Sequence, residues 1–238
     1  LVVLILFSSN WVFAKELEEF YRGMRAMGMG NAFSAVVDDE DAIFYNPAAI
    51  AYNNLMKLEL LNPKIDGSTG ILGSVSAIRE MASGITGSSL DKFLGQHLYI
   101  DASVFPAIHF PHFTLGYLYR GQLNTITRNP SFPQMEARSV IDTGVILGTG
   151  WELKGFSKSD FLRIGGTFKY LSRQGFDETI HLSKLVSADE SFFKGLTGGP
   201  SPGYGLTLGT QYEISFGGRS DLTFAAVWND IGNTRFGT

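Results

Sequence analysis

The chain has 238 residues, of which 44% are hydrophobic, 13% aromatic and 18% charged, with a net charge of −4 and a pI near 5.6. This length suits one substantial domain, the charged fraction is below the ~25% usual for soluble domains, and the acidic balance argues against a nucleic-acid partner. Cysteine is absent, which excludes a disulfide framework and a thiolate metal site, and the 28 glycines favour β-architecture over a helical bundle.

Residues 1–14 have the pattern of a secretory signal peptide. An unbroken apolar run, LVVLILF, is followed by a polar break and by Val12-Phe13-Ala14, so cleavage is expected after Ala14. The run is too short to cross a bilayer as a helix, which takes ~20 residues. Because no basic region or initiator methionine precedes it, we expect that the first few residues are missing. The alternative, a buried N-terminal strand, seldom precedes a boundary of this kind.

Residues 15–54 form a segment of a different character from the rest of the chain. Residues 23–52, GMRAMGMGNAFSAVVDDEDAIFYNPAAIAY, combine small residues, methionines and an acidic run at 38–41. Asn is a favoured helix N-cap and Pro is tolerated at the first helical position, so Asn46-Pro47 is expected to open a short helix. A segment this rich in small residues can fit inside a narrow space.

The same segment resembles the N-terminal hatch of the FadL-type outer-membrane long-chain fatty-acid transporters. It is also similar to related envelope barrels, such as the PorV/PorQ-like barrels of type IX secretion. The resemblance rests on Gly-x-Arg-Ala-x-Gly-x-Gly-x-Ala-Phe, an Asp-rich step and Tyr45-Asn46-Pro47-Ala48. It implies a transmembrane barrel plugged by a hatch, with these motif residues: Gly28, Gly30, Asp38, Asp39, Asn46, Pro47 and Ala48.

From residue 55 onward the sequence alternates with a period of two, as β-strands do. In residues 160–173 one face carries Leu162, Ile164, Phe168 and Tyr170, and the other carries Arg163, Thr167, Lys169 and Arg173. Similar alternation at 113–120, 203–215 and 221–229 predicts three more strands. Residues 98–105 and 140–153 alternate less clearly, and 55–65, which contains Pro63, is the weakest of seven predicted strands.

Alternation of this kind is typical both of soluble sandwiches and of membrane barrels. Aromatic residues favour the barrel, because Tyr204 and Tyr212 bracket Leu206 and Leu208, and Trp151 and Trp228 fall at strand ends. Membrane barrels carry such aromatic girdles at both edges of the apolar band. The alternative for any one aromatic is ordinary core packing.

The predicted connections alternate between long and short, as an up-and-down outer-membrane barrel requires. The long ones are 66–97, 128–138 and 174–202, and the short ones are 106–112, 154–159 and 216–220. Seven strands are an odd number, whereas bacterial single-chain barrels have an even one, so we expect this to be the N-terminal part of a longer protein. The family resemblance implies fourteen strands.

Two of the long loops have apolar residues at helical spacing, in 71–94 and 180–196. Amphipathic helices there are expected either to cap the mouth of the barrel or to offer a landing site for an apolar ligand.

Charged residues on the polar faces of the strands are expected to face the lumen, because Arg or Lys at the bilayer centre costs ~2–4 kcal/mol. They are Arg120, Arg163, Lys169, Arg173, Glu213 and Asp221. We expect the acidic run of the hatch to pair with the cationic ones and to close the lumen. The run could instead hold a divalent cation, but salt bridges or a solvated helix start are the favoured interpretations.

No catalytic, cofactor or metal motif is complete in this sequence. Gly28-Met29-Gly30 has Phe33 in place of the third glycine of a dinucleotide fingerprint, and the acidic run lacks the spacing of an EF-hand. His109 and His112 are too few for a zinc site, and no serine lies in a Gly-x-Ser-x-Gly elbow. An enzyme is therefore disfavoured, no cofactor is expected, and no ligand-binding residues can be assigned.

The resemblance implies passive uptake of hydrophobic small molecules, such as long-chain fatty acids, across a bacterial outer membrane. The alternative is a non-transporting barrel of the PorV-like kind, a structural or secretion-associated scaffold with a protein partner in the envelope. An apolar lumen would favour the first function, and a polar, tightly filled lumen the second.

Overall fold

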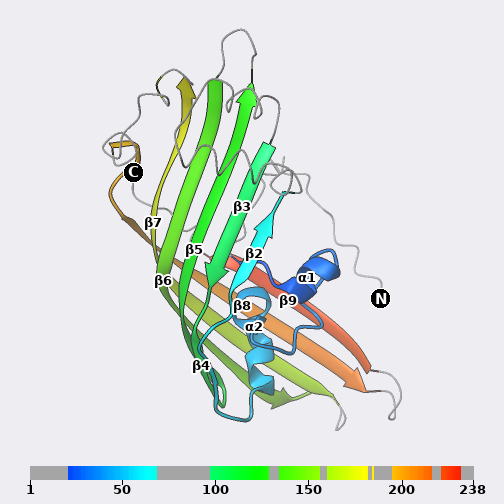
Figure 1. The fold of residues 1–238 in the computed structure, drawn as a ribbon. Coiled ribbons are helices and arrows are strands. Elements are labelled where there is room, and N and C mark those ends of the chain that lie inside the picture. The colour runs from blue at the N-terminus through cyan, green and yellow to red at the C-terminus, as the bar shows by residue number, and fades with distance from the viewer. Residues whose placement is uncertain are drawn as a thin grey trace, which may run out of the picture.

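The computed structural model describes residues 21–68, 97–128, 134–155, 160–181, 184, 195–215 and 221–231. Within them the main feature is a single antiparallel sheet, preceded by three short helices (Figure 1). The helices are α1 (Met24–Gly28), α2 (Ala42–Tyr45) and the 3-10 helix η1 (Pro47–Tyr52). The strands are β1 (Lys57–Glu59), β2 (Lys64–Gly67), β3 (His97–Val104), β4 (Ala107–Phe110), β5 (Phe113–Arg128), β6 (Gln134–Lys154), β7 (Phe161–His181), β8 (Ser201–Ser215) and β9 (Asp221–Ile231). The expected all-β class is confirmed.

Neighbouring strands in the sheet are also neighbours along the chain. The order is β1-β4-β5-β6-β7-β8-β9, with β2 paired to β3 and β3 to β5. β1 and β2 occupy one position in the sheet, as do β3 and β4, so the described sheet has seven positions. Each of the two breaks contains a proline, Pro63 or Pro106, which has no backbone N–H to offer the ladder. The predicted meander is therefore present, with its first two strands interrupted.

Several strands are longer than the sequence predicted. β6 begins at Gln134 and β7 ends at His181, and the two pair in register along their whole length. The predicted loops 128–138 and 174–202 were therefore too long, as was 106–112, of which 107–110 belong to β4. The predicted signal peptide at 1–14 and the loop helix at 71–94 lie outside the described residues, as does most of 180–196.

The two faces of the sheet have opposite polarity, and the apolar face is the exposed one. On β7, Phe168 and Tyr170 are 48% and 51% exposed, while Thr167, the residue before Phe168, is fully buried. On β5 and β8, too, apolar side chains are exposed and polar ones are buried. The large exposed apolar side chains of these two strands are Phe113, Leu115, Tyr117, Tyr119, Leu123, Tyr204, Leu206 and Leu208.

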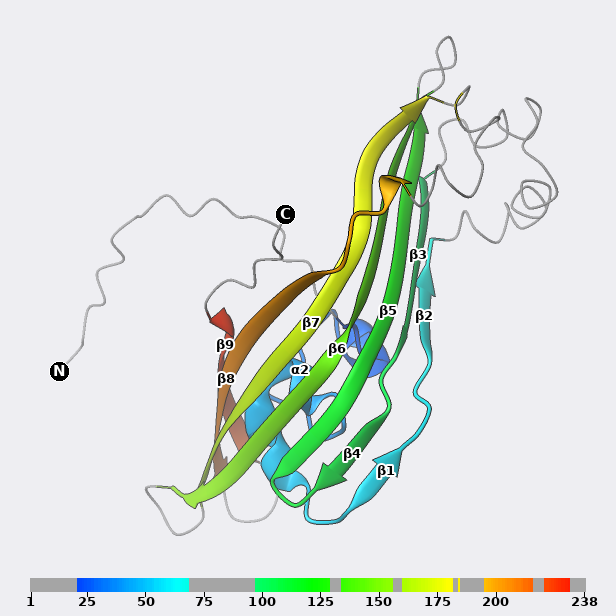
Figure 2. The same cartoon turned by 90° about the vertical axis from the view of Figure 1, so that its left-hand side faces the viewer.

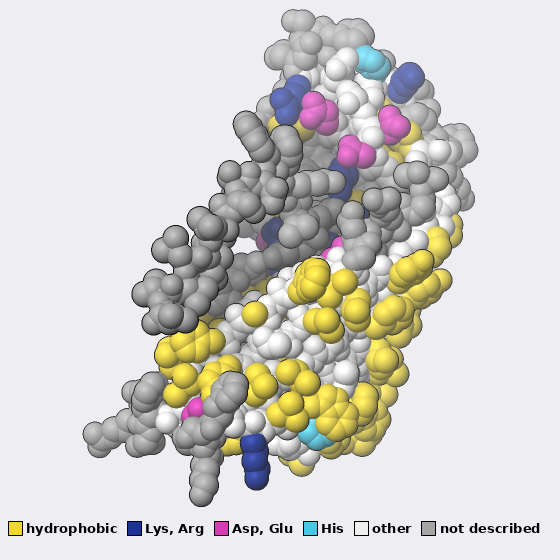
Figure 3. Space-filling model, turned by 180° about the vertical axis from the view of Figure 1, so that it is seen from behind, with side chains coloured by type: hydrophobic (Ala, Val, Ile, Leu, Met, Phe, Trp, Pro, Cys, Tyr) yellow, Lys and Arg dark blue, Asp and Glu magenta, His cyan; other side chains and the backbone are white. Residues whose placement is uncertain are grey.

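Charged side chains, in contrast, gather toward one end of the molecule. Figure 3 shows hydrophobic side chains spread over the lower part of the face in view and charged ones near its upper end. At that upper end, apolar side chains of β6 and β7 are covered: Ala137 and Ile180 are buried, with Phe176 and Leu196 packed against them. The chain thus covers its apolar side chains there and leaves them bare lower down.

Candidate functional site

The N-terminal segment, residues 21–53, lies on the concave side of the sheet, against β6, β7 and β8 (Figure 2). Its apolar side chains form the main core of the described structure together with inward residues of the strands. Phe44 stacks on Tyr21 with ring centroids 3.9 Å apart and meets Phe105 edge-on at 4.8 Å. The segment is therefore packed into the sheet rather than laid across its edge.

Asn46 fixes the middle of this segment. It is fully buried, with φ −155° and ψ 103°, and its Oδ1 accepts a hydrogen bond from the Ala48 amide at 3.1 Å. Its Nδ2 donates to the carbonyl of Ser34 at 2.9 Å and to that of Thr210, on β8, at 3.2 Å. Pro47 then occupies the first helical turn, as the sequence predicted. One side chain thus caps η1 and ties it to the sheet.

Glycines of three adjacent strands make room for this turn. Gly150, Gly165 and Gly209 lie side by side in register across β6, β7 and β8. A Cβ on Gly165 would stand 2.6 Å from the Ala48 amide nitrogen and closer still to the Pro47 carbonyl. A Cβ on Gly150 would stand 2.7 Å from that same carbonyl oxygen. We call these three residues the glycine row; they let η1 approach the strand backbones directly.

Two further inward side chains bind backbone groups of the segment. Thr167 Oγ1 donates to the Ile43 carbonyl at 2.9 Å, and Gln211 Nε2 donates to the Ser34 carbonyl at 3.3 Å. Both side chains are fully buried. The sequence placed Thr167 on the polar face of its strand, but it predicted no site role for Thr167, Gln211 or the glycine row. The available signal was glycine, threonine or glutamine at inward positions of consecutive predicted strands, where charged residues also occur.

We predict that Asn46→Asp will loosen the segment at least as much as Asn46→Ala. Aspartate keeps the cap, which is worth ~1 kcal/mol. It replaces the amide donor with an oxygen facing two carbonyl oxygens, and an unsatisfied buried polar group costs ~1–3 kcal/mol. Thiol labelling of a cysteine placed at Ala49, which is 3% exposed, reports the loosening. Slow, parent-like labelling of the Asp variant would mean that the cap alone holds the turn.

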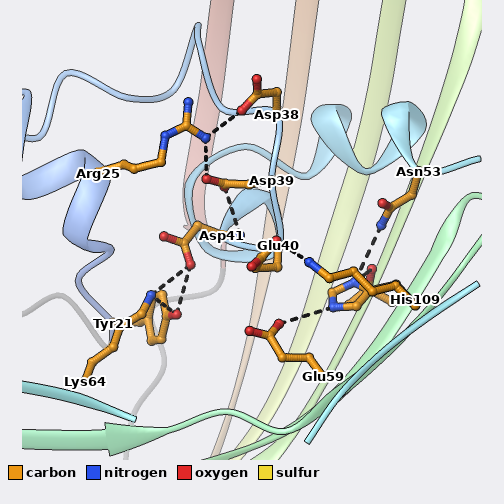
Figure 4. Close-up of polar contacts among 12 residues, drawn as sticks. Tyr21, Arg25, Asp38, Asp39, Glu40, Asp41, Asn53, Glu59, Lys64 and His109 are labelled. Atoms are coloured by element: carbon orange, nitrogen blue, oxygen red, sulfur yellow. Dashed lines mark hydrogen bonds and ion pairs between the residues drawn. The ribbon is translucent and has the colours of Figure 1, made fainter. Parts of the chain in front are cut away.

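The acidic run binds cations other than the four expected (Figure 4). Arg25, within the segment, binds Asp38 at 2.7 Å and Asp39 at 2.5 Å. Lys57 of β1 binds Glu40 at 2.8 Å, and Lys64, the first residue of β2, binds Asp41 at 2.9 Å. The run therefore connects the segment to the edge strands β1 and β2.

Burial shifts the titration of groups in this cluster. Burial, reinforced by the Asp41 carboxylate that accepts its hydrogen bond at 2.9 Å, raises the pKa of the Tyr21 hydroxyl. Burial raises the pKa of Glu40, but the hydrogen bond and the charge of Lys57, together with a backbone hydrogen bond, outweigh it, so the pKa of Glu40 lies below its ordinary value. Tyr21 thus remains a neutral donor and Glu40 an anion at neutral pH.

The predicted lumen cations lie on the inner face of the sheet and bind carboxylates of the strands. Arg120 Nε donates to Asp101 at 2.8 Å, and Arg173 Nε donates to Asp142 at 2.7 Å. Lys169 is also buried on this face. Because these carboxylates come from the sheet itself, Arg120 and Arg173 pair within the sheet and not, as expected, with the acidic run.

Arg163, another of the predicted lumen cations, contacts the N-terminal segment. It binds Glu152 at 2.8 Å and Glu213 at 2.6 Å, and its Nη1 donates to the Tyr52 hydroxyl at 2.7 Å. Tyr52 lies at the end of η1, and its ring also faces the guanidinium at 4.0 Å. Glu213 therefore binds a cation on the inner face of the sheet, where the sequence predicted its side chain to lie.

The motif glycines differ in what they do. Gly30 has φ +61°, which a residue with a side chain rarely adopts, and a Cβ on Gly23 would overlap the Asp41 carboxylate. A Cβ on Gly28 would meet nothing within 4 Å in the described part of the chain. Backbone conformation explains Gly30 and close packing explains Gly23, while Gly28 has no such explanation here.

The two predicted histidines lie in different surroundings. His109 is buried and contacts Thr114 Oγ1 at 3.0 Å, whereas His112, in the β4–β5 turn, stacks on Trp151 with centroids 4.8 Å apart. Among the described residues no cluster of three or more His, Asp or Glu side chains could hold a metal ion, and no helix is long and apolar enough to cross a membrane. Comparisons with protein-family models, curated proteins and solved structures found no match for this chain.

Proposed function

We propose that this sheet is part of an up-and-down β-barrel in a bacterial outer membrane, plugged by the N-terminal segment, that takes up hydrophobic small molecules such as long-chain fatty acids. The observation that carries the proposal is the inverted polarity of the sheet. On β7, Thr167 and Lys169 are buried, while Phe168 and Tyr170 are half exposed. In hydrocarbon this arrangement is favourable, because apolar side chains meet lipid and polar ones are satisfied inside.

Strand lengths support a membrane-spanning role. An apolar band ~25 Å tall is crossed by ~9–11 residues of a tilted strand. β8 has 15 residues, and β6 and β7 have 21 each. The two longest strands would therefore extend beyond the bilayer at the end where charged side chains gather and where Leu196 covers apolar ones. The bare apolar band would face lipid.

The two edges of the sheet are where a barrel would close. The edge formed by β1 and β2 and the edge formed by β9 run in the same direction, because they are the first and the seventh positions of an antiparallel sheet. Closure by antiparallel pairing alone thus takes an odd number of further strands. Unpaired backbone groups in hydrocarbon cost several kcal/mol each, which strongly favours closure. At the edge formed by β1 and β2, the further strands would cover Leu61 and Ile65, which are 79% and 81% exposed.

The N-terminal segment fits the role of a plug. It occupies the concave side and reaches the strand backbones through the glycine row. It also packs Tyr21 and Phe44 against Phe105, which lies between β3 and β4, on the inside of the sheet. Because Tyr21 and Phe105 are buried with the segment in place, this apolar surface would meet a hydrophobic solute when the segment moves.

A second candidate function is a non-transporting, secretion-associated or structural barrel with a protein partner in the envelope. One observation favours it: much of the described inner wall is polar and filled, with Arg120, Asp142 and Arg163 all buried in ion pairs. A lumen of this kind suits a plug that stays in place. The two candidates differ in whether the cell depends on the protein for apolar nutrients.

Growth on a long-chain fatty acid as sole carbon source separates them. We expect a deletion strain to grow more slowly than its parent on this acid, to match it on acetate, and to recover with the gene supplied on a plasmid. Equal growth of deletion strain and parent on both carbon sources would contradict uptake. A defect confined to protein secretion or envelope integrity would support the second candidate.

A further inference from the structure

The N-terminal segment is held differently on its two sides. Toward β6, β7 and β8 its contacts around η1 are neutral and buried: Asn46 and Gln211 are fully buried, and η1 lies on the glycine row. At the end of η1, the partly exposed Tyr52 adds a contact with the charged Arg163. Toward β1 and β2 its contacts are ionic. We call the first set the anchor and the second the ionic seam, which consists of Glu40 with Lys57, Asp41 with Lys64 and Arg22 with Asp66.

The Glu40–Lys57 pair of the ionic seam is open to solvent. The side chains of Lys57 and Glu40 are 53% and 31% exposed, so water and salt screen their attraction. The pair of Lys64 with Asp41 is more buried, at 12% and 8%. β1 and β2 have only three and four residues and are separated by Pro63, so the strand that carries both lysines is itself interrupted.

A small cavity lies along this seam. It holds about 20 Å³, enough for about one water molecule, between Arg22 of the segment and the inner faces of β2, β3 and β5. Lys64, Asp66, Asp101, Ser103 and Arg120 complete its lining. Arg120 is 3% exposed, and in the described structure its Nη1 has no hydrogen-bond partner, its nearest carboxylate being Asp142 at 3.9 Å. Packing is thus incomplete on this side, where a buried donor remains available to a solute.

We propose that the N-terminal segment opens along the ionic seam while the anchor stays closed, so that water and small ions pass first between the segment and β1, β2 and β3. This inference rests on the proposed barrel and adds which side of its plug opens first. Loss of the Glu40–Lys57 contact frees the acidic run from β1. The charged lining of the cavity then hydrates, while Asn46 continues to hold η1 to β8.

Charge reversal at Lys57 tests the seam. In planar bilayers containing the full-length protein, Lys57→Glu should raise the open probability by about two- to fivefold, as expected from the loss of one partly exposed ion pair. The double variant Glu40→Lys with Lys57→Glu should return it to the parent value. Arg128→Glu is the control, because Arg128 forms a comparably exposed pair with Glu136 at 3.3 Å between β5 and β6. Failure of the double variant to rescue would overturn the proposal.

A thiol cross-link gives a second readout that does not depend on charge. The chain has no cysteine, so Glu40→Cys with Lys57→Cys can be joined by a short bifunctional maleimide. We expect the linked protein to lose the conductance that the unlinked protein shows. Unchanged conductance after complete linking would overturn the seam.

Deletion of residues 21–53 separates failure of this inference from failure of the proposed function. If the deletion opens a large pore while the Lys57 variants and the cross-link change nothing, the plug yields elsewhere and the barrel proposal stands. If neither the full-length protein nor the deletion variant conducts, although both are present in the bilayer, the barrel proposal fails and this inference fails with it.

Discussion

Gly165→Ala should displace the N-terminal segment from the sheet. Its new methyl group would lie within 2.6 Å of the Ala48 amide nitrogen and closer to the Pro47 carbonyl, and both groups belong to the backbone. A backbone cannot rotate away as a side chain does, so η1 must move off the sheet. Overpacking of this kind costs ~1–3 kcal/mol, which corresponds to ~5- to 150-fold more of the open state.

Gly166→Ala is the matched control for this change. Gly166 is the next residue on β7 and points to the other face, where a Cβ would meet Leu208 Cδ2 at an ordinary 3.4 Å. Both variants carry the cysteine at Ala49, and the rate of maleimide labelling is compared. We expect fast labelling of the Gly165 variant and parent-like labelling of the Gly166 variant. Equal rates would show that the glycine row does not seat the segment.

The sequence predicted the strands whose two faces differ. β7 and β8 alternate apolar with polar residues through their lower parts, and both were predicted there. The upper parts of β6 and β7 were assigned to loops; there Glu136, Arg138 and Asp177 lie together on one face, and Glu178 interrupts the apolar residues of the other. What holds them as strands is the continuous pairing of Gln134 through Lys154 with β7, which no local pattern indicates.

The candidate site was predicted in part, for a similar reason. The Asn46-Pro47 turn follows from local capping chemistry, and the structure contains it. The glycine row depends on the register of three strands, and the partners of the acidic run depend on where β1 and β2 lie. Lys57 and Lys64 belong to the strand that Pro63 interrupts, which was the least certain of the seven. Local patterns thus identified the segment but not the surface that receives it.

Phe168→Arg should strongly destabilise the protein in lipid. Phe168 is 48% exposed in the middle of the bare apolar band on β7. Arginine facing the bilayer midplane costs ~2–4 kcal/mol, whereas an exposed substitution in water usually changes stability by less than ~0.5 kcal/mol. The size of the loss therefore reports which solvent the face meets. Urea titration of the protein folded into phospholipid vesicles measures it.

Glu178→Arg provides the comparison within the same strand. By the alternation of β7 it lies on the same face as Phe168, but it is already charged, is exposed, and lies where charged side chains gather. Near or beyond the interface the cost of arginine falls to ~0–1 kcal/mol. A large loss for the Phe168 variant with a small one for the Glu178 variant would place lipid against the band. Small losses for both would mean that water or another protein covers this face, and the membrane barrel would have to be abandoned.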